Sequence, residues 1–237
     1  MSEQTQANPE GYLLVDKPQG WTSFDVVAKV RGALQRELRQ ATGERCKLKV
    51  GHIGTLDPMA TGLLVLMVGK YTKRVPEFIK QDKTYQTELK LGLTSTTGDS
   101  EGELTAVSDA VPTEEEVQKV IQTFVGEQMQ TPPAYSAIKV DGQRAYKLAR
   151  QGKKVELKPR PVTINSITDI SYKYPKITFT CDVSSGTYIR SLVEGIGEQL
   201  GAGAYMSALH RTKIDQFDIR NAILVEEVDT SRLSRLS

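Results

Sequence analysis

An uninterrupted apolar run, Leu63–Val68, constrains the fold more than any other stretch of this sequence. Gly62 and Gly69 stand at its two ends, and its length suits a strand rather than a helix. A strand without polar residues at alternate positions has two apolar faces, and both must be covered. The run therefore predicts a buried strand.

The residues that lead into this run, 51–62, read as a constrained loop. Pro58 disfavours the helical conformation at Asp57, and three glycines permit tight turns or a close approach of the backbone: Gly51, Gly54 and Gly62. Such a loop could hold the carboxylate of Asp57 rigidly against a ligand, with the imidazole of His52 nearby in the sequence. An ordinary Asp-Pro turn with a hydrogen-bonded histidine fits the same residues.

Composition places the chain among ordinary globular proteins. Its 237 residues are enough for one large domain, with or without a small appendage. No apolar run is long enough to cross a membrane. The two cysteines, Cys46 and Cys181, are far apart, and His52 and His210 are the only histidines. These observations argue against a disulfide framework and a metal site, and they fit a reducing, cytoplasmic location.

A net charge of +2 is too small to indicate a nucleic-acid-binding protein, but it conceals separated blocks of charge. Basic residues dominate 29–49 and 139–160, whereas 99–116 contains acidic residues and no Lys or Arg. A charged run is most often only a solvated surface. Because the first basic block leads directly into the Asp57 loop, we expect it to face phosphate groups, and the acidic block to face away from such groups.

Periodicity along the chain predicts a mixture of strands and helices. Alternation or an apolar run predicts strands at 11–16, 63–68, 84–92, 162–170 and 177–183. Helical spacing predicts helices that begin near Thr22, Thr113, Tyr146 and Thr187, and the second of these is expected to end at Gly126. Tyr85 falls on the apolar face of its strand, so an ordinary core aromatic is one interpretation of it.

Arg190 falls in the first turn of the last predicted helix. A cation there opposes the helix dipole, at a cost of up to about 1 kcal/mol. A merely solvated arginine is therefore poorly placed, and we expect Arg190 to have a carboxylate partner.

The loop and the apolar run together resemble the signature of a known family. The stretch Gly51-His52-x-Gly54-Thr55-Leu56-Asp57-Pro58-x-Ala60-Thr61-Gly62-Leu63-Leu64 is similar to that of the TruB-type tRNA pseudouridine synthases. Further blocks that resemble the family follow in order: Asp16-Lys17-Pro18-x-Gly20-x-Thr22-Ser23, Lys83-Thr84-Tyr85, Thr94-x-Thr96-x-x-Asp99-x-x-Gly102, Pro132-Pro133-x-Tyr135-Ser136-Ala137, Gly186-Thr187-Tyr188-Ile189-Arg190 and Leu209-His210-Arg211-Thr212. Ile53 and His210 depart from the residues that are frequent in the family, and both changes concern affinity more than chemistry.

This resemblance implies an α+β fold in which helices flank a central, mainly antiparallel mixed sheet, with the site in a cleft across it. It implies a catalytic domain over residues 11–220, with a mobile, RNA-gripping loop at about 130–160. We expect a flexible tail over residues 1–10. We also expect a short extension over 221–237 in place of the small RNA-binding domain that many relatives carry.

The resemblance also implies an isomerase that converts the T-loop uridine at position 55 of tRNA to pseudouridine. In the family, the catalytic aspartate corresponds to Asp57, the arginine that pairs with it to Arg190, and the tyrosine that packs on the target base to Tyr85. The carboxylate could attack the sugar or remove a sugar proton, and the sequence leaves both open. No cofactor and no metal are implied.

The remaining site residues follow from the same matched blocks. The target base must be extruded from a folded loop, and His52 would occupy the gap or stack on a displaced nucleotide. The residues that would line the base pocket are Tyr188 and Leu209. Structural support of the site is expected from Lys17, Gly54 and Gly186.

The expected partner is the T stem-loop of tRNA, with no membrane, no obligate protein partner and a monomeric state. Assistance with tRNA folding is a further expectation. Two other classes compete: a non-catalytic RNA-binding or RNA-folding module that keeps the fold, and a related enzyme that acts on other RNAs with a guide partner. Intact Asp57, Tyr85 and Arg190 favour the enzyme over the module.

Overall fold

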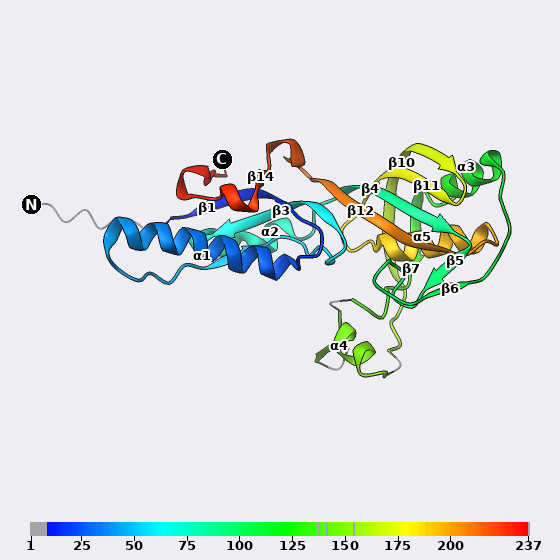
Figure 1. Ribbon diagram of the computed structural model, residues 1–237, viewed down its shortest axis with the longest axis horizontal. Coiled ribbons are helices and arrows are strands. Elements are labelled where there is room, and N and C mark those ends of the chain that lie inside the picture. Colours follow the sequence, from blue (N-terminus) through cyan, green and yellow to red (C-terminus); the bar gives the residue numbers. More distant parts are fainter. Residues whose placement is uncertain (1–8, 137, 141, 154, 237) are drawn as a thin grey trace, which may run out of the picture. The chain divides into compact units, whose positions relative to one another are not determined.

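The computed structural model describes residues 9–136, 138–140, 142–153 and 155–236 (Figure 1). The chain divides into two compact units. The first comprises the residues up to Gln81 together with those from His210 onward, and the second comprises Asp82–Leu209. Most of the tail expected over residues 1–10 lies outside the described residues.

A sheet built around β3 (Thr61–Val68) forms the first unit. β1 (Gly11–Lys17) runs antiparallel to β3 along its length. β2 (Val50–His52) also pairs antiparallel with β3, and the end of β12 (Ala204–Ile214) pairs parallel with its first residues. Two short strands extend these pairings, β13 (Phe217–Asp218) on β12 and β14 (Ile223–Leu224) on β1. The 3-10 turns of this unit are η1 (Gly69–Arg74), η2 (Ile219–Asn221), η3 (Val225–Glu227) and η4 (Thr230–Arg232).

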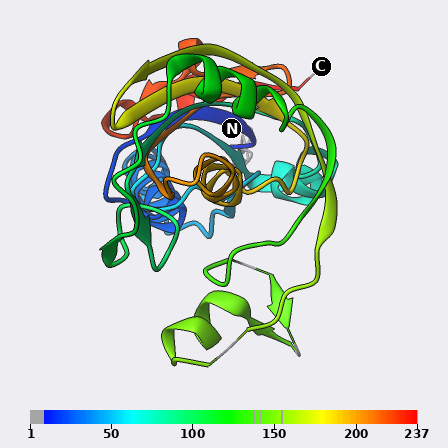
Figure 2. The same cartoon turned by 90° about the vertical axis from the view of Figure 1, so that its right-hand side faces the viewer.

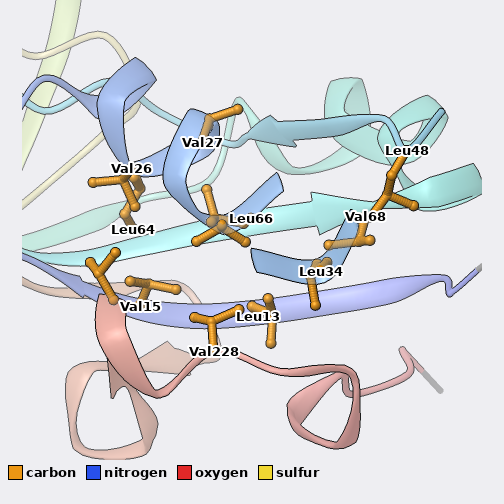
Figure 3. Packing of buried hydrophobic residues seen from close by; sticks show 12 residues of the cluster. Leu13, Val15, Val26, Val27, Leu34, Leu48, Leu64, Leu66, Val68 and Val228 are labelled. Carbon is orange, nitrogen blue, oxygen red and sulfur yellow. The ribbon is translucent and has the colours of Figure 1, made fainter. Parts of the chain in front are cut away.

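The predicted buried strand is β3, and both of its faces are covered by cores. Its even-numbered residues Leu64, Leu66 and Val68 lie in a cluster with α1 (Ser23–Thr42), shown in Figure 3. Its odd-numbered residues lie in a second cluster that includes Phe78 of α2 (Val75–Phe78): Leu63, Val65 and Met67. The run therefore contains no polar residue because neither face of the strand meets water.

α1 begins where its sequence predicts. The Thr22 hydroxyl accepts a hydrogen bond from Asp25 N, and the Asp25 carboxylate accepts one from Thr22 N, which forms a capping box. The helix ends before Gly43, whose φ of 75° suits glycine. The residues that it buries against the sheet have the predicted helical spacing: Val26, Val27, Val30 and Leu34.

An antiparallel sheet and two principal helices form the second unit. Its strands lie in the order β12, β4 (Lys83–Leu91), β11 (Lys176–Val183), β10 (Arg160–Lys173) and β7 (Gly126–Gln130). α3 (Glu114–Gln122) packs on β10, and α5 (Ile189–Gln199) packs on β4. Figure 2 shows α5 nearly end-on, with β10 and β11 on one side of it. The smaller elements are the hairpin of β5 (Leu93–Ser95) and β6 (Leu104–Ala106), the hairpin of β8 (Lys139–Val140) and β9 (Gln143–Arg144), and α4 (Ala145–Arg150).

The expected fold class is confirmed, since helices flank mainly antiparallel strands with parallel pairings at β1–β14 and β3–β12. Two local predictions are wrong. The loop expected from Gly51 begins later, because residues 50–52 pair with the far end of β3. α3 ends at Gln122 rather than at Gly126, which begins β7 instead.

Gly62 offers a test of how closely β3 and β12 approach. Its φ is +100°, and a Cβ added there would lie 2.8 Å from Arg211 N and closer still to Arg211 O. We expect Gly62→Ala to lower the free energy of unfolding by roughly 3 kcal/mol or more, from backbone strain and overpacking together. Urea denaturation measures this.

Gly20→Ala is the matched control, because Gly20 also has a positive φ, +81°, but a Cβ there meets nothing within 4 Å. Its cost should be limited to the backbone term, about 1–2 kcal/mol. Equal losses in the two variants would show that the approach of β12 to β3 does not constrain Gly62.

Candidate functional site

The Asp57 loop connects β2 to β3 and contains a tight turn. Ala60 N donates to Asp57 O at 3.1 Å, so Asp57 and Pro58 occupy the first two positions of the turn. Ile53 N donates to Val65 O at 3.1 Å and keeps the start of the loop against β3. Asp57 is half-buried.

Lys17, at the end of β1, is fully buried beneath this loop. Its ammonium donates to Pro18 O at 2.9 Å, to Trp21 O at 2.6 Å and to Pro58 O at 3.3 Å. Gly20 N donates to the same Pro58 carbonyl at 2.8 Å. A buried ammonium needs several hydrogen bonds to offset its lost hydration, and one of these fixes the residue directly after Asp57.

Arg211, in β12, holds the other side of the loop. It is 1% exposed, and its guanidinium donates to Gly54 O at 3.0 Å, to Thr55 O at 3.5 Å and to Leu63 O at 2.9 Å. The planar fork of a guanidinium suits several acceptors at once. Arg211 therefore ties the loop before Asp57 to the first residues of β3.

Ser23 supplies the third attachment, at the start of α1. Its hydroxyl donates to Leu56 O at 3.0 Å and accepts from Leu56 N at 2.8 Å. Both backbone groups of the residue directly before Asp57 are thereby satisfied inside the protein. The peptides on both sides of Asp57 are fixed by buried side chains, so the carboxylate projects from a rigid backbone.

His52 lies at the end of β2, at the entrance to this loop. Its Nδ1 accepts a hydrogen bond from Gly54 N at 3.3 Å. Burial lowers the pKa of the imidazole, and the nearby Arg211 guanidinium lowers it further. The histidine is therefore mostly neutral at pH 7.

The second unit contains the other expected site residues, and Arg190 is the most constrained of them. It lies in the first turn of α5 and is 5% exposed. Its guanidinium lies 3.5 Å from the Asp99 carboxylate and donates to Thr97 O at 3.0 Å and to Tyr135 O at 2.8 Å. Arg190 thus has a carboxylate partner, as its place in the helix predicts, and within this unit that partner is Asp99. Its pairing with Asp57 stays a prediction.

Glu194, one turn after Arg190 on α5, adds a second acid to this group. Burial raises the pKa of its carboxyl, the Arg190 guanidinium acts in the opposite direction, and Asp99 raises the pKa again. The carboxyl groups of Asp99 and Glu194 therefore both interact electrostatically with the Arg190 guanidinium.

The remaining predicted residues are placed as follows. Tyr85 lies on the buried face of β4 and is 8% exposed, Tyr188 stands at the N-cap of α5, and Leu209 lies buried in β12. Gly186 has a φ of +91° in the turn before α5.

In the first unit the structure brings Lys17, His52, Gly54 and Asp57 to one loop, and in the second it brings Tyr188 and Arg190 to one helix end. The roles assigned to all of them stay predictions.

Three site residues were not assigned roles from the sequence: Ser23, Asp99 and Arg211. Each stands inside a block that resembles the family, so a signal existed. The role of each depends on a contact across the chain, such as that of Arg211 with residues about 150 positions earlier.

Within the described part of the chain, no group of three or more His, Cys, Asp or Glu side chains could hold a metal ion. No described helix is long and apolar enough to cross a membrane. Cys46 and Cys181 are both free thiols.

The chain is similar to proteins of one family. Residues 39–189 match the family described as TruB family pseudouridylate synthase (N terminal domain), and residues 190–234 match the tRNA pseudouridylate synthase B C-terminal domain. The tRNA pseudouridine synthase B of Parabacteroides distasonis is 44% identical over 92% of this chain and 91% of its own length. That of Endomicrobium trichonymphae is 41% identical over 96% of this chain and 95% of its own.

A solved structure described as a Cbf5-Nop10-Gar1 complex also resembles this chain. Its matched chain is 28% identical with a TM-score of 0.67, over 92% of this chain and 53% of the solved one. A second, an H/ACA RNP bound to a substrate RNA containing 2'-deoxyuridine, gives a TM-score of 0.63 at 26% identity, over 92% and 51%. The chain spans about half the length of these solved chains.

Arg211 provides a test of how the Asp57 loop is held. Arg211→Met removes the donors of three backbone carbonyls, and we expect it to lower the free energy of unfolding by about 3–5 kcal/mol. Arg211→Lys keeps the charge but loses the fork, and should cost roughly half as much. The exposed Arg220, paired with Asp218 on the surface of the same unit, is the matched control. If Arg220→Met costs as much as Arg211→Met in urea denaturation, the loop does not depend on this guanidinium.

His52 provides a test of pH dependence. Because its folded pKa lies below the ordinary value of 6.5, the unfolded chain binds more protons near and below that pH. Its contribution to stability is therefore complete above pH 6.5 and decreases as the pH falls toward the folded pKa. The free energy of unfolding should fall less between pH 7.5 and 5.5 in His52→Gln than in the unmodified protein. Identical pH profiles in the two proteins would contradict this assignment.

Proposed function

The chain belongs to the TruB family of pseudouridylate synthases and is an isomerase that acts on uridine in tRNA, and from this premise we propose that its target is the T-loop uridine at position 55. The observation that carries the proposal is the Asp57 loop. This loop lies within the family's signature and carries a half-buried carboxylate. The peptides next to that carboxylate are fixed by Lys17, Arg211 and Ser23. A rigid carboxylate is what a reaction centred on one acid requires.

The chemistry needs few participants. The bond between N1 of uracil and C1′ of ribose breaks, the uracil turns, and a bond forms between C5 and C1′ while the C5 proton is lost and N1 regains one. No atom enters or leaves overall. Ordinary glycosidases use two carboxyl groups because the leaving base or sugar must be protonated and replaced by water. Here the detached base is retained, so we assign the essential step to Asp57 alone, either as nucleophile at the sugar or as base toward a sugar proton.

Residues of the second unit complete the proposed site. Arg190 would pair with Asp57 and keep the carboxylate ionised and oriented. Tyr85 would stack on the uracil and assist the loss of the C5 proton. Tyr188 and Leu209 would line the base pocket, and His52, in the first unit, would stack on a displaced nucleotide.

Recognition of the tRNA is proposed to depend on the shape of the T stem-loop and on contacts with its phosphates. Exposed basic side chains on and after α1 support this assignment of the 29–49 block: Lys29, Arg36, Arg39, Arg45, Lys47 and Lys49. The first turn of α3 is exposed and acidic, so this helix would face away from the RNA. The monomeric state, the independence of a protein partner, the cytoplasmic location and an additional role in tRNA folding stay predictions.

Asp57→Asn tests the proposed role directly, because the amide has nearly the same shape and cannot act as nucleophile or base. We expect this variant to lower the rate of pseudouridine formation in an unmodified tRNA transcript by at least about 1000-fold, while its Kd for the tRNA changes little. Mapping of pseudouridine along the transcript reports both the rate and the position. Asp215→Asn is the matched control, since Asp215 is an exposed turn residue whose φ of 48° asparagine also tolerates.

The same experiment separates the competing functions. Binding of tRNA without any conversion by the unmodified protein would indicate a non-catalytic RNA-binding or RNA-folding module. Conversion only when a second RNA is added would indicate a guide-dependent enzyme. Conversion of a uridine outside the T-loop, or retained activity in Asp57→Asn, would overturn the proposal.

A further inference from the structure

The chain leaves and re-enters the sheet of the second unit at one pair of residues. Gln130, the last residue of β7, lies opposite Arg160, the first residue of β10, in the antiparallel pairing of these strands. The segment between them carries α4, which lies apart from these strands in Figures 1 and 2. It also carries the basic block of residues 139–160, part of the loop that is expected to grip RNA. The pair therefore connects this proposed RNA-binding segment to the sheet.

The side chain of Gln130 holds the backbone of Tyr188. Its Nε2 donates to Tyr188 O at 3.0 Å, and its Oε1 accepts from Tyr188 N at 2.8 Å. These are the two hydrogen bonds that a residue of a neighbouring strand would make. Because Gln130 is only 7% exposed, the amide cannot readily exchange these bonds for water.

The side chain of Arg160 holds the ring of the same tyrosine. Its guanidinium carbon lies 5.4 Å from the centre of the Tyr188 ring, and one terminal nitrogen lies 3.4 Å from the Tyr188 hydroxyl. The Nε of Arg160 is buried and has no hydrogen-bond partner among the described residues. An unpaired buried donor lowers stability, so hydrogen bonding at Nε does not explain the position of this guanidinium. The contact with Tyr188 is what the position provides.

We propose that Gln130 and Arg160 are positioning residues that set the place of Tyr188 in the base pocket. The inference rests on the proposed function, in which Tyr188 lines that pocket. Tyr188 is the N-cap of α5 and directly precedes Ile189 and Arg190, so a shift of Tyr188 moves the proposed catalytic arginine as well.

Two further hydrogen bonds join the RNA-binding segment to the same helix end. Ser191 Oγ donates to Thr131 O at 3.0 Å, and Arg190 donates to Tyr135 O at 2.8 Å. The first residues of the segment and the first turn of α5 therefore form one bonded group. Contacts of the tRNA with the segment and contacts of the uracil with the pocket share this anchor.

A simpler role for Arg160 is one more phosphate contact within the basic block. The two roles have opposite signatures. Loss of a phosphate contact weakens tRNA binding and lowers the slope of log Kd against log salt by about one. Loss of a positioning residue leaves binding and its salt dependence unchanged and lowers the rate of the bound complex, since small displacements of reacting groups reduce rates strongly.

The experiment measures single-turnover rates at saturating unmodified tRNA, and Kd for the tRNA at several salt concentrations. We expect Gln130→Leu and Arg160→Met to lower the rate roughly 10- to 100-fold, with Kd within about threefold and an unchanged salt slope. Arg160→Lys keeps the charge and most of the volume but loses the planar stack, and should show a smaller loss of rate of the same kind. Thermal unfolding identifies any variant that is not folded, in which case Gln130→Glu and Arg160→Lys carry the test.

Two matched controls share the chemistry but not the contact. Gln128 lies on the same strand and donates to Phe124 O at 2.8 Å, so Gln128→Leu removes a glutamine bond of similar length away from Tyr188. Arg74 stacks on Tyr71 at 5.7 Å in the first unit, so Arg74→Lys removes an arginine–tyrosine stack elsewhere. Both controls should retain the full rate.

A double-mutant cycle decides whether Arg160 acts through Tyr188. If it does, Arg160→Met should cause no further loss of rate in a Tyr188→Leu background. Multiplicative losses, or a weaker Kd with a reduced salt slope and a full rate in Arg160→Met, would overturn the inference and leave the proposed function intact. An unmodified protein that converts no uridine would overturn the proposed function, and the inference with it.

Discussion

The shape of the Asp57 loop depends on the way in which buried cations bind the backbone carbonyls around Asp57. A loop between two strands has peptide groups that no neighbouring strand can satisfy, and inside a protein each of them needs a partner. Lys17 and Arg211 supply partners at Gly54, Thr55, Pro58 and Leu63, and Ser23 completes the set at Leu56. The loop is fixed by side chains that come from three separate elements, so it keeps its shape without regular structure.

Burial of Lys17 and Arg211 lowers the stability of the protein, which indicates that these residues serve another purpose. Moving an ammonium or a guanidinium out of water costs several kcal/mol per ion, and well-packed apolar residues in the same place often give an equally or more stable protein. Apolar side chains, however, cannot donate to carbonyls on both sides of one residue. The cations also place positive charge beneath a loop that presents an acid. Precise placement of Asp57 is therefore the benefit that offsets their burial.

Much of the fold follows from local patterns in the sequence, whereas much of the site does not. The apolar run predicts β3, alternation predicts β4 and β11, and the capping residues of α1 and α3 are legible because each acts within a few positions of its partner. β2 is not predictable from the sequence, because three residues are too few to show a strand pattern. Only their pairing with the far end of β3 identifies them as a strand. The bracing role of Arg211 was missed because its acceptors are about 150 positions away. The position of Arg190 in the first turn of a helix predicts a nearby carboxylate, but only the fold identifies that carboxylate as Asp99.

The Asp99 contact changes how the role of Arg190 should be understood. An arginine already paired with a buried carboxylate, and bonded to Thr97 O and Tyr135 O, has its position set within its own unit. A guanidinium carries five N–H donors, enough to keep these contacts and to bind another carboxylate. Under the proposed function, Asp57 would pair with a cation whose orientation is already fixed, and two mobile groups would not have to orient against each other. Less conformational entropy remains to be lost when the reacting groups assemble, which is the advantage that preorganisation gives to catalysis.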